Sequence, residues 1–388
     1  MNVVRSNFSF GMMHRKGVSM KHKMIKKVVA GSVSATLAFA PLMGNACTSF
    51  TLKGSDGGVV YGRSMEMGFP LHSQLTLMPR NFTKQGIGPD GKVGSGLTWT
   101  TKYAVAGMNA VGMPEYSDGM NEKGLIGGMQ NAPNTAKYQT VTPADAANSI
   151  SSAQVVTYVL TNFATVNEIK AGLQKIKVSG VPVPSFGNQV PTQHYGFHDA
   201  TGKSVVVEYI KGELVVTDNP TGAMTNDPAF SAQLNSIGNY ANLTKSEKPA
   251  LVINGATFVP PSSGSGLHGL PGDYLSPSRF IRAVFLTDSV PKSYTSAQMH
   301  NAAWHILGSF DIPPGAVTLP ANNPYGGGVG GIEITEWSTV ADTKSMTYSI
   351  KMFENMNVYE FDLKKMDVNA KDIKYIKLDK PASPMLVN

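Results

Sequence analysis

The chain has 388 residues, 41% of them hydrophobic, and a formal net charge of +7. Seven of its 33 Lys and Arg residues precede Cys47 but none of its 26 Asp and Glu residues does, so the segment from Cys47 onward carries 26 of each sign. That neutral segment gives no reason to expect a nucleic acid or a membrane surface as partner. It also lacks any apolar run approaching the ~18–20 residues that span a bilayer.

Residues 1–46 have the pattern of an export signal. The basic residues end at Lys27, an apolar run follows over residues 28–43, and Gly-Asn-Ala closes the segment at 44–46. A basic region, a short apolar region and small residues before the cleavage point are the parts of a secretory signal peptide. We therefore expect cleavage just before Cys47 and a periplasmic or secreted mature protein. The translation start is open between Met1, Met20 and Met24.

Cleavage at this point would make Cys47, the only cysteine, the amino-terminal residue. A thiol is intrinsically nucleophilic, and an α-amine that titrates at about pH 7.7–8.0 can accept its proton, as in hydrolases with amino-terminal Thr, Ser or Cys. A buried inert cysteine and an acylated lipoprotein anchor are the alternatives. The anchor is disfavoured because Gly44 stands where such signals carry an aliphatic residue, and residues 48–52 are typical of a strand rather than of a polar tether.

A β-hairpin is expected at the start of the mature segment. Residues 48–53 and 59–65 are predicted strands on either side of the turn sequence Gly-Ser-Asp-Gly-Gly at 54–58. A turn centred near Asp56 places Cys47 opposite Met65, with Arg63 and Glu66 close by. A guanidinium near the sulfur would lower the pKa of the thiol, and a carboxylate could orient the amine. From spacing alone, both charged residues could equally be solvated.

The remaining segment is predicted to contain groups of strands and groups of helices in turn. Strands are expected at 73–79, 103–108, 125–129, 194–197, 204–210, 213–217, 332–337, 346–353 and 358–362. A helical region is expected from residues 142–145 to about 177, and helices are expected after residues 226–228 and at 276–286 and 296–309. This order indicates a layered α+β fold rather than alternating α/β units. Without a repeat or a linker, residues 47–388 are expected to form one catalytic domain.

Several motifs then occur in a recognisable order: CTSF at 47–50, GRSME at 62–66, DGMNEKGL at 118–125, DNPTGAMTNDP at 218–228, GLPGDYLSPSRFIR at 269–282 and WSTVAD at 337–342. Together they resemble the choloylglycine hydrolase family, which includes penicillin V acylases and conjugated bile salt hydrolases. The resemblance implies a four-layer αββα N-terminal-nucleophile hydrolase with two antiparallel sheets, often a homotetramer. It also implies hydrolysis of a linear amide through a thioester, without a cofactor or a metal.

The resemblance also implies roles for individual residues. Cys47 is the nucleophile and its α-amine the base, Arg63 lies beside the sulfur, Asn226 donates to the oxyanion, and Arg279 is a second active-site arginine. Taken without the resemblance, Asn226 could simply cap the helix that follows it, and Arg279 could be a surface residue.

The sequence departs from the family pattern at three places. Glu66 stands where the family usually has Asp, and Met67 where an aromatic residue is common. A further polar oxyanion or pocket residue falls at either Gln130 or Asn131.

We expect Met65, Met67 and Phe69 to line a pocket for an apolar acyl group. They occupy alternate positions at the end of the predicted hairpin and just after it. The substrate class is an N-acylated small molecule. Penicillin V, a conjugated bile salt and an acyl-homoserine lactone stay open as candidates, and the exported character favours the penicillin V acylase type. His194 and His198 are four residues apart, but their surroundings predict strand and turn, so a metal site is not expected there.

Overall fold

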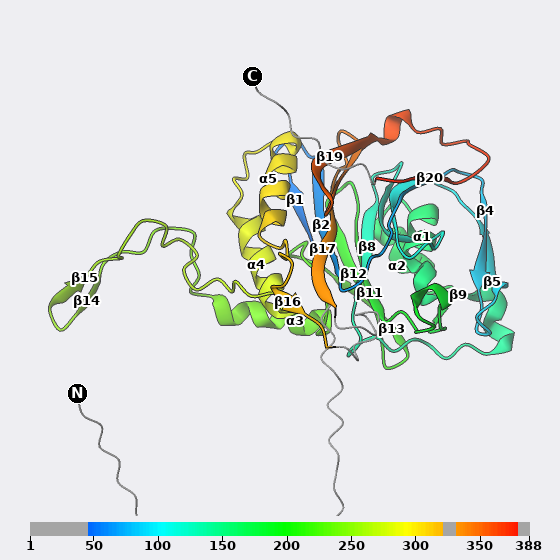
Figure 1. Ribbon diagram of the computed structural model, residues 1–388, viewed down its shortest axis with the longest axis horizontal. Helices are drawn as coiled ribbons and strands as arrows, with labels where there is room; N and C mark the ends of the chain where they lie inside the picture. The colour runs from blue at the N-terminus through cyan, green and yellow to red at the C-terminus, as the bar shows by residue number, and fades with distance from the viewer. Residues whose placement is uncertain (1–45, 321–330, 379–388) are drawn as a thin grey trace, which may run out of the picture. The chain divides into compact units, whose positions relative to one another are not determined.

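Two antiparallel sheets lie face to face between two layers of helices (Figure 1). The structure, a computed structural model, describes residues 46–320 and 331–378. The expected signal segment lies almost wholly outside these residues. The predicted four-layer arrangement of the mature segment is present, with α4 and α5 outside the first sheet and α1 and α2 outside the second.

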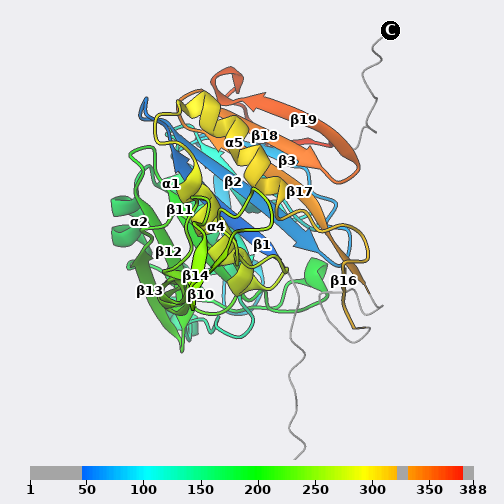
Figure 2. The same cartoon turned by 90° about the vertical axis from the view of Figure 1, so that its left-hand side faces the viewer.

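The first sheet contains the nucleophile. Its strand order is β1-β2-β17-β18-β19, and β16 pairs with β17. The bounds are β1 Cys47–Lys53, β2 Val59–Met67, β16 Val317–Thr318, β17 Ile332–Asp342, β18 Thr347–Met352 and β19 Asn355–Asp362. Figure 2 shows α4 (Ser276–Ser289) and α5 (Ser296–Gly308) lying across this sheet. Segments far apart in the sequence meet here, because β17 pairs with β2 although more than 260 residues separate them.

The second sheet has the strand order β13-β12-β11-β8-β7-β6-β3-β20. The bounds are β3 Leu75–Met78, β6 Val105–Asn109, β7 Tyr116–Asn121, β8 Ile126–Asn131, β11 Gln193–His198, β12 Ser204–Ile210, β13 Glu213–Asp218 and β20 Lys374–Ile376. Its outer face is covered by α1 (Val155–Asn162) and α2 (Val166–Leu173). Most residues of its central strands are buried, as expected for a sheet packed on both faces.

Strand β2 is buried along its whole length because its two faces pack against different layers. Tyr61 and Met65 face the second sheet, whereas Val60 packs among apolar residues of α4 and α5. Gly62 lies under the ring of Phe50, where a Cβ would be 2.5 Å from Cζ. Because successive side chains of a strand point to opposite faces, this strand contributes to two cores.

The helix expected from about 145 to 177 is not continuous. The segment begins with a 3-10 helix, Pro143–Asn148, and a short strand β9, Ser149–Ser151, which pairs in parallel with β10, Lys177–Ser179. The α-helices α1 and α2 follow, separated where Thr165 caps α2 by accepting from the backbone N–H of Glu168. Local capping and strand pairing thus interrupt the helical pattern.

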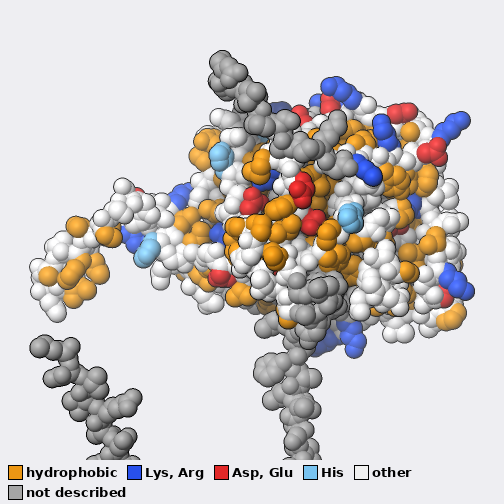
Figure 3. Space-filling model, in the orientation of Figure 1, with side chains coloured by type: hydrophobic (Ala, Val, Ile, Leu, Met, Phe, Trp, Pro, Cys, Tyr) orange, Lys and Arg blue, Asp and Glu red, His pale blue; other side chains and the backbone are white. Residues whose placement is uncertain are grey.

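Two small hairpins were not predicted from the sequence. Strands β4 (Thr83–Ile87) and β5 (Val93–Thr100) form one, and β14 (Leu251–Ile253) and β15 (Ala256–Phe258) form the other. Figures 1 and 3 show β14 and β15 standing apart from the layered body, with hydrophobic side chains at their tip. A further short helix, α3, spans Phe230–Ser236.

Candidate active site

Cys47 opens β1 and is buried, with only 3% of its surface exposed. The predicted register is confirmed, because Cys47 pairs with Met65 and Ser49 with Arg63. The backbone nitrogen of Cys47 donates to Oδ1 of Asn226 at 2.7 Å, and its Sγ lies 3.5 Å from Sδ of Met65. The residue expected to act as nucleophile is thus fixed at both its nitrogen and its sulfur.

Burial and nearby charges act in opposite directions on this thiol. Burial raises the pKa of Cys47, since a thiolate is poorly solvated there, while the positive charge of Arg63 opposes that effect. Glu66 raises the pKa further by its charge, whereas its backbone N–H and Arg279 lower it. The thiolate therefore depends on positive groups held close to the sulfur.

Arg63 is fully buried and held from several directions. Its Nη1 donates to the carbonyl of Ser117 at 2.5 Å and lies 3.4 Å from Oδ1 of Asp118, and its Nη2 donates to the carbonyl of Met129. Gly128 makes this approach possible, since a Cβ there would collide with Nη1. Asp118 is itself fixed by hydroxyl groups of three other strand residues, Tyr61, Thr339 and Tyr348. The sequence motif contained Asp118, but its contact with Arg63 required the fold.

Asn226 and Arg279 meet beside the Cys47 nitrogen. Nη2 of Arg279 donates to Oδ1 of Asn226 at 2.8 Å, and its Nη1 donates to the carbonyl of Cys47 at 2.5 Å and to Oγ1 of Thr48 at 2.9 Å. Arg279 is 1% exposed, so it is not a surface residue. Asn226 does not cap α3, whose N-cap is Ala229. Its Nδ2 donates to the carbonyl of Asn131 at 2.9 Å.

Glu66 is buried next to this group but does not bond the Cys47 nitrogen. Its Oε1 accepts from Oγ1 of Thr335 at 3.3 Å, and its Oε2 has no hydrogen-bond partner among the described residues. Burial raises the pKa of Glu66 to about 8, with Arg279 opposing the effect. A second buried carboxylate, Glu333, accepts from the backbone nitrogen of Ala46 at 2.5 Å. Sequence reasoning missed Glu333, which belongs to no quoted motif.

Gln130 and Asn131 are engaged differently. Nε2 of Gln130 donates to Oγ of Ser49 at 2.9 Å and to the carbonyl of Met224 at 3.1 Å, so this amide ties the two sheets together. Asn131 accepts at Oδ1 from Thr192, while its buried Nδ2 has no hydrogen-bond partner within the described part of the chain. Asn131 therefore has the uncommitted donor of the two.

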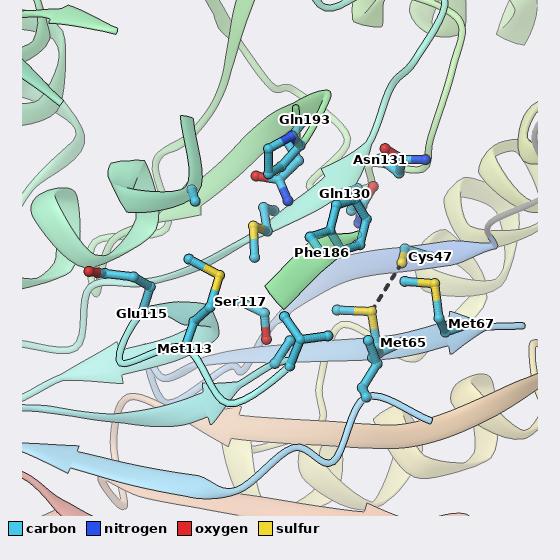
Figure 4. A pocket seen from close by; sticks show the side chains of 16 residues that line it. Cys47, Met65, Met67, Met113, Glu115, Ser117, Gln130, Asn131, Phe186 and Gln193 are labelled. Atoms are coloured by element: carbon cyan, nitrogen blue, oxygen red, sulfur yellow. Dashed lines mark hydrogen bonds between the residues drawn. The ribbon is translucent and has the colours of Figure 1, made fainter. Parts of the chain in front are cut away.

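An apolar pocket opens onto Cys47 (Figure 4). Met65 and Met67 line it, as expected, together with Met113, Met129 and Phe186. Phe69 does not line it but contacts the ring of Phe186, at 6.3 Å between ring centroids. This apolar lining suits an apolar group, and the flexible Met side chains can adapt to its shape.

The two histidines that lie four residues apart make other contacts. His194 interacts with Glu208 and the carbonyl of Thr225, and His198 with Ser204. Within residues 46–320 and 331–378, no group of three His, Cys, Asp or Glu side chains could hold a metal ion. The same residues include no helix long and apolar enough to cross a membrane.

Comparison with known proteins gives consistent matches. Residues 47–376 match the model of the linear amide C–N hydrolases, choloylglycine hydrolase family. The bile salt hydrolase/transferase of Clostridium perfringens is 29% identical over 346 residues, covering 88% of this chain and 100% of that relative. The penicillin V acylase of Pectobacterium atrosepticum is 27% identical over 375 residues, covering 92% of each.

Solved structures agree with these sequence matches. A variant of the conjugated bile acid hydrolase from Clostridium perfringens aligns with a TM-score of 0.77 at 29% identity, covering 88% of this chain and all of that one. The penicillin V acylase from Agrobacterium tumefaciens aligns with a TM-score of 0.68 at 24% identity, covering 87% and 94%. At that identity the second alignment supports the fold alone. The two-sheet fold expected from the motifs is confirmed.

Proposed function

The chain belongs to the choloylglycine hydrolase family of linear amide C–N hydrolases, and we propose that it is an exported amidase of penicillin V acylase type. Its substrate is an N-acylated small molecule with an apolar acyl group. The observation that carries this proposal is the apolar cavity that opens onto the buried thiol of Cys47.

The reaction follows from the groups around Cys47. Sγ attacks the amide carbonyl while the α-amine of the processed residue takes the thiol proton. The tetrahedral oxyanion is stabilised by Nδ2 of Asn131, the uncommitted donor beside the cavity. Expulsion of the amine, which receives the proton, leaves a thioester on Cys47. Water then attacks the thioester and releases the acid and the thiol.

Asn226 and the two arginines prepare these steps. Asn226, to which the family resemblance gives the role of oxyanion donor, already donates its Nδ2 to the carbonyl of Asn131. We assign it instead to accepting from the Cys47 nitrogen and so fixing its direction. Arg63 favours the thiolate by its charge, and Arg279 holds both Asn226 and the Cys47 carbonyl. Asn226, Arg63 and Arg279 are thus assigned to positioning the nucleophile and its base rather than to binding the acyl group.

Two substrate classes compete with penicillin V. Relatives are named as bile salt hydrolases, so a conjugated bile salt is one, and a long-chain acyl-homoserine lactone is the other, since its acyl chain is apolar and flexible. We would measure kcat/KM for phenoxymethylpenicillin, glycocholate and long-chain acyl-homoserine lactones side by side. A preference for phenoxymethylpenicillin supports the proposed type, a preference for another substrate replaces it, and hydrolysis of none contradicts an amidase of this class.

Export and activation are proposed to be one event, since the α-amine does not exist until the bond between Ala46 and Cys47 is cleaved. Intact mass of the protein recovered from the cell envelope or the medium tests this. A mass that starts at an unmodified Cys47 supports the amidase and its periplasmic or secreted location. Added diacylglycerol and acyl mass would instead indicate the lipoprotein anchor.

The hairpin of β14 and β15 supports a homo-oligomer, as the family resemblance implies. Leu251, Val252 and Phe258 are each more than half exposed on it. Such exposed apolar groups are costly in a monomer and typical of a contact surface.

A further inference from the structure

Glu333 is a buried carboxylate that the proposed mechanism does not use. It lies at the start of β17 with 1% of its surface exposed. Its Oε1 accepts from the backbone nitrogen of Ala46, which is itself 5% exposed. A carboxylate is therefore fixed one residue away from the nitrogen that becomes the α-amine.

We propose that Glu333 is a positioning residue for the amino group of Cys47, reached through one water molecule after Ala46 is removed. Consecutive residues are about 3.8 Å apart along the chain, so the place of the Ala46 nitrogen is suited to a bridging water. The amino group then donates to Asn226 directly and to Glu333 through that water. This inference rests on the proposed function, because it requires a processed Cys47.

The charge of Glu333 is expected to affect the protonation of the Cys47 amino group. Glu66 and Arg63 face the site from β2, Arg279 from α4 and Glu333 from β17, whereas the carboxylate of Asp227, next to Asn226, accepts from Asn134 and Thr135. Burial raises the pKa of Glu333, and the Ala46 N–H and Arg279 oppose that effect. A nearby negative charge favours an ammonium over an amine. Glu333 therefore keeps the amino group protonated to a higher pH, and so sets the pH at which the base becomes available.

The test compares processed wild type with Glu333→Gln and Glu333→Asp. Glu336→Gln is the matched control, because Glu336 is a half-buried carboxylate on the same strand whose side chain accepts from the backbone nitrogen of Leu71 instead. Two profiles are recorded from about pH 5 to 9. One is kcat/KM for the best amide substrate, and the other is the rate of alkylation of Cys47 by iodoacetamide, followed by intact mass.

Loss of the Glu333 charge should move the acidic limb of both profiles to lower pH by about one unit. Glu333→Asp and Glu336→Gln should retain the wild-type position. Superimposable wild-type and Glu333→Gln profiles would overturn the proposal, as would an equal shift in Glu336→Gln. If Glu333→Gln does not fold, a wild-type limb in Glu333→Asp supports the proposal and a limb moved to lower pH contradicts it. Alkylation needs no substrate, so failure of the amidase proposal stays distinguishable from failure of this one.

Discussion

The sulfur of one buried residue is the atom on which the proposed chemistry depends. Cys47→Ala removes Sγ but leaves the backbone contacts with Asn226 and Arg279 in place. We expect export and processing as in the wild type, a melting temperature within a few degrees of it, and a loss of hydrolysis of at least about 10³-fold. Amide hydrolysis, thermal unfolding and intact mass check this. Wild-type turnover in the variant would exclude Cys47 as the nucleophile.

Two neighbouring amides are expected to respond differently to truncation. Asn131→Ala removes a donor with no hydrogen-bond partner among the described residues, so kcat should fall by about 10²–10³-fold with a small change in stability. Gln130→Ala removes two buried hydrogen bonds to Ser49 and Met224, so it should cost about 1–3 kcal/mol of unfolding free energy.

Steady-state kinetics and denaturant unfolding of both variants separate these effects. The assignment of Asn131 to the oxyanion would be wrong if Asn131→Ala kept its kcat while Gln130→Ala lost it.

Site residues that lie close together in the sequence could be predicted to lie close together in the structure. Cys47, Arg63 and Glu66 lie within one hairpin, and its register follows from the turn alone. The choice between Gln130 and Asn131 was not predictable, because it depends on which amide already has partners on the facing sheet. Glu333 was not predictable either, since no periodicity shows that it lies beside Ala46.

Elements with an alternating pattern and a clear turn were predicted well, and those fixed by distant partners were not. Strands β1 and β2 match their expected bounds within two residues. The helix expected over 145–177 was wrong in its first part because β9 pairs with β10. Strands β5 and β14 of the two small hairpins lack a continuous buried face, and the alternately buried positions of β4 are Lys84 and Gly86, which give no apolar periodic signal.

The hairpin of β14 and β15 is the element expected to hold subunits together. Charged substitutions at Val252 and Phe258, Val252→Asp with Phe258→Asp, place charge where apolar contact is proposed. Light scattering during size exclusion should then show a smaller assembly than for the wild type. Val93→Asp is the control, because Val93 is 68% exposed on the other small hairpin. An unchanged assembly in the double variant would exclude this hairpin as the contact.

At the scale of the whole molecule, the formal net charge of +7 does not describe the charge of the segment that forms the site. The segment from Cys47 onward is formally neutral, and its site contains two arginines and two carboxylates in one buried region. Processing would add a positive amino group to this region. In the proposed function, cleavage would therefore supply the base and also change the electrostatic balance on which the stability of the folded chain depends.

That change predicts a pH dependence that differs before and after processing. Burial raises the pKa of Glu66 to about 8 in the folded chain with Ala46 in place, so folding binds a proton that the unfolded carboxyl, with a pKa of about 4.3, has released. The stabilisation is fully present below the unfolded pKa and is lost as the pH rises through the folded one. A form expressed from Met43 should therefore lose on the order of 5 °C in melting temperature between about pH 5 and 8.

The matched variant Glu66→Gln in the same form should lose less, because the titrating group is gone. The processed protein should also lose less, since its ammonium favours the ionised carboxylate. Thermal unfolding of the three forms in a single buffer series at constant ionic strength checks this. Equal slopes against pH would show that Glu66 is already ionised without the amino group, and that cleavage does not alter its charge.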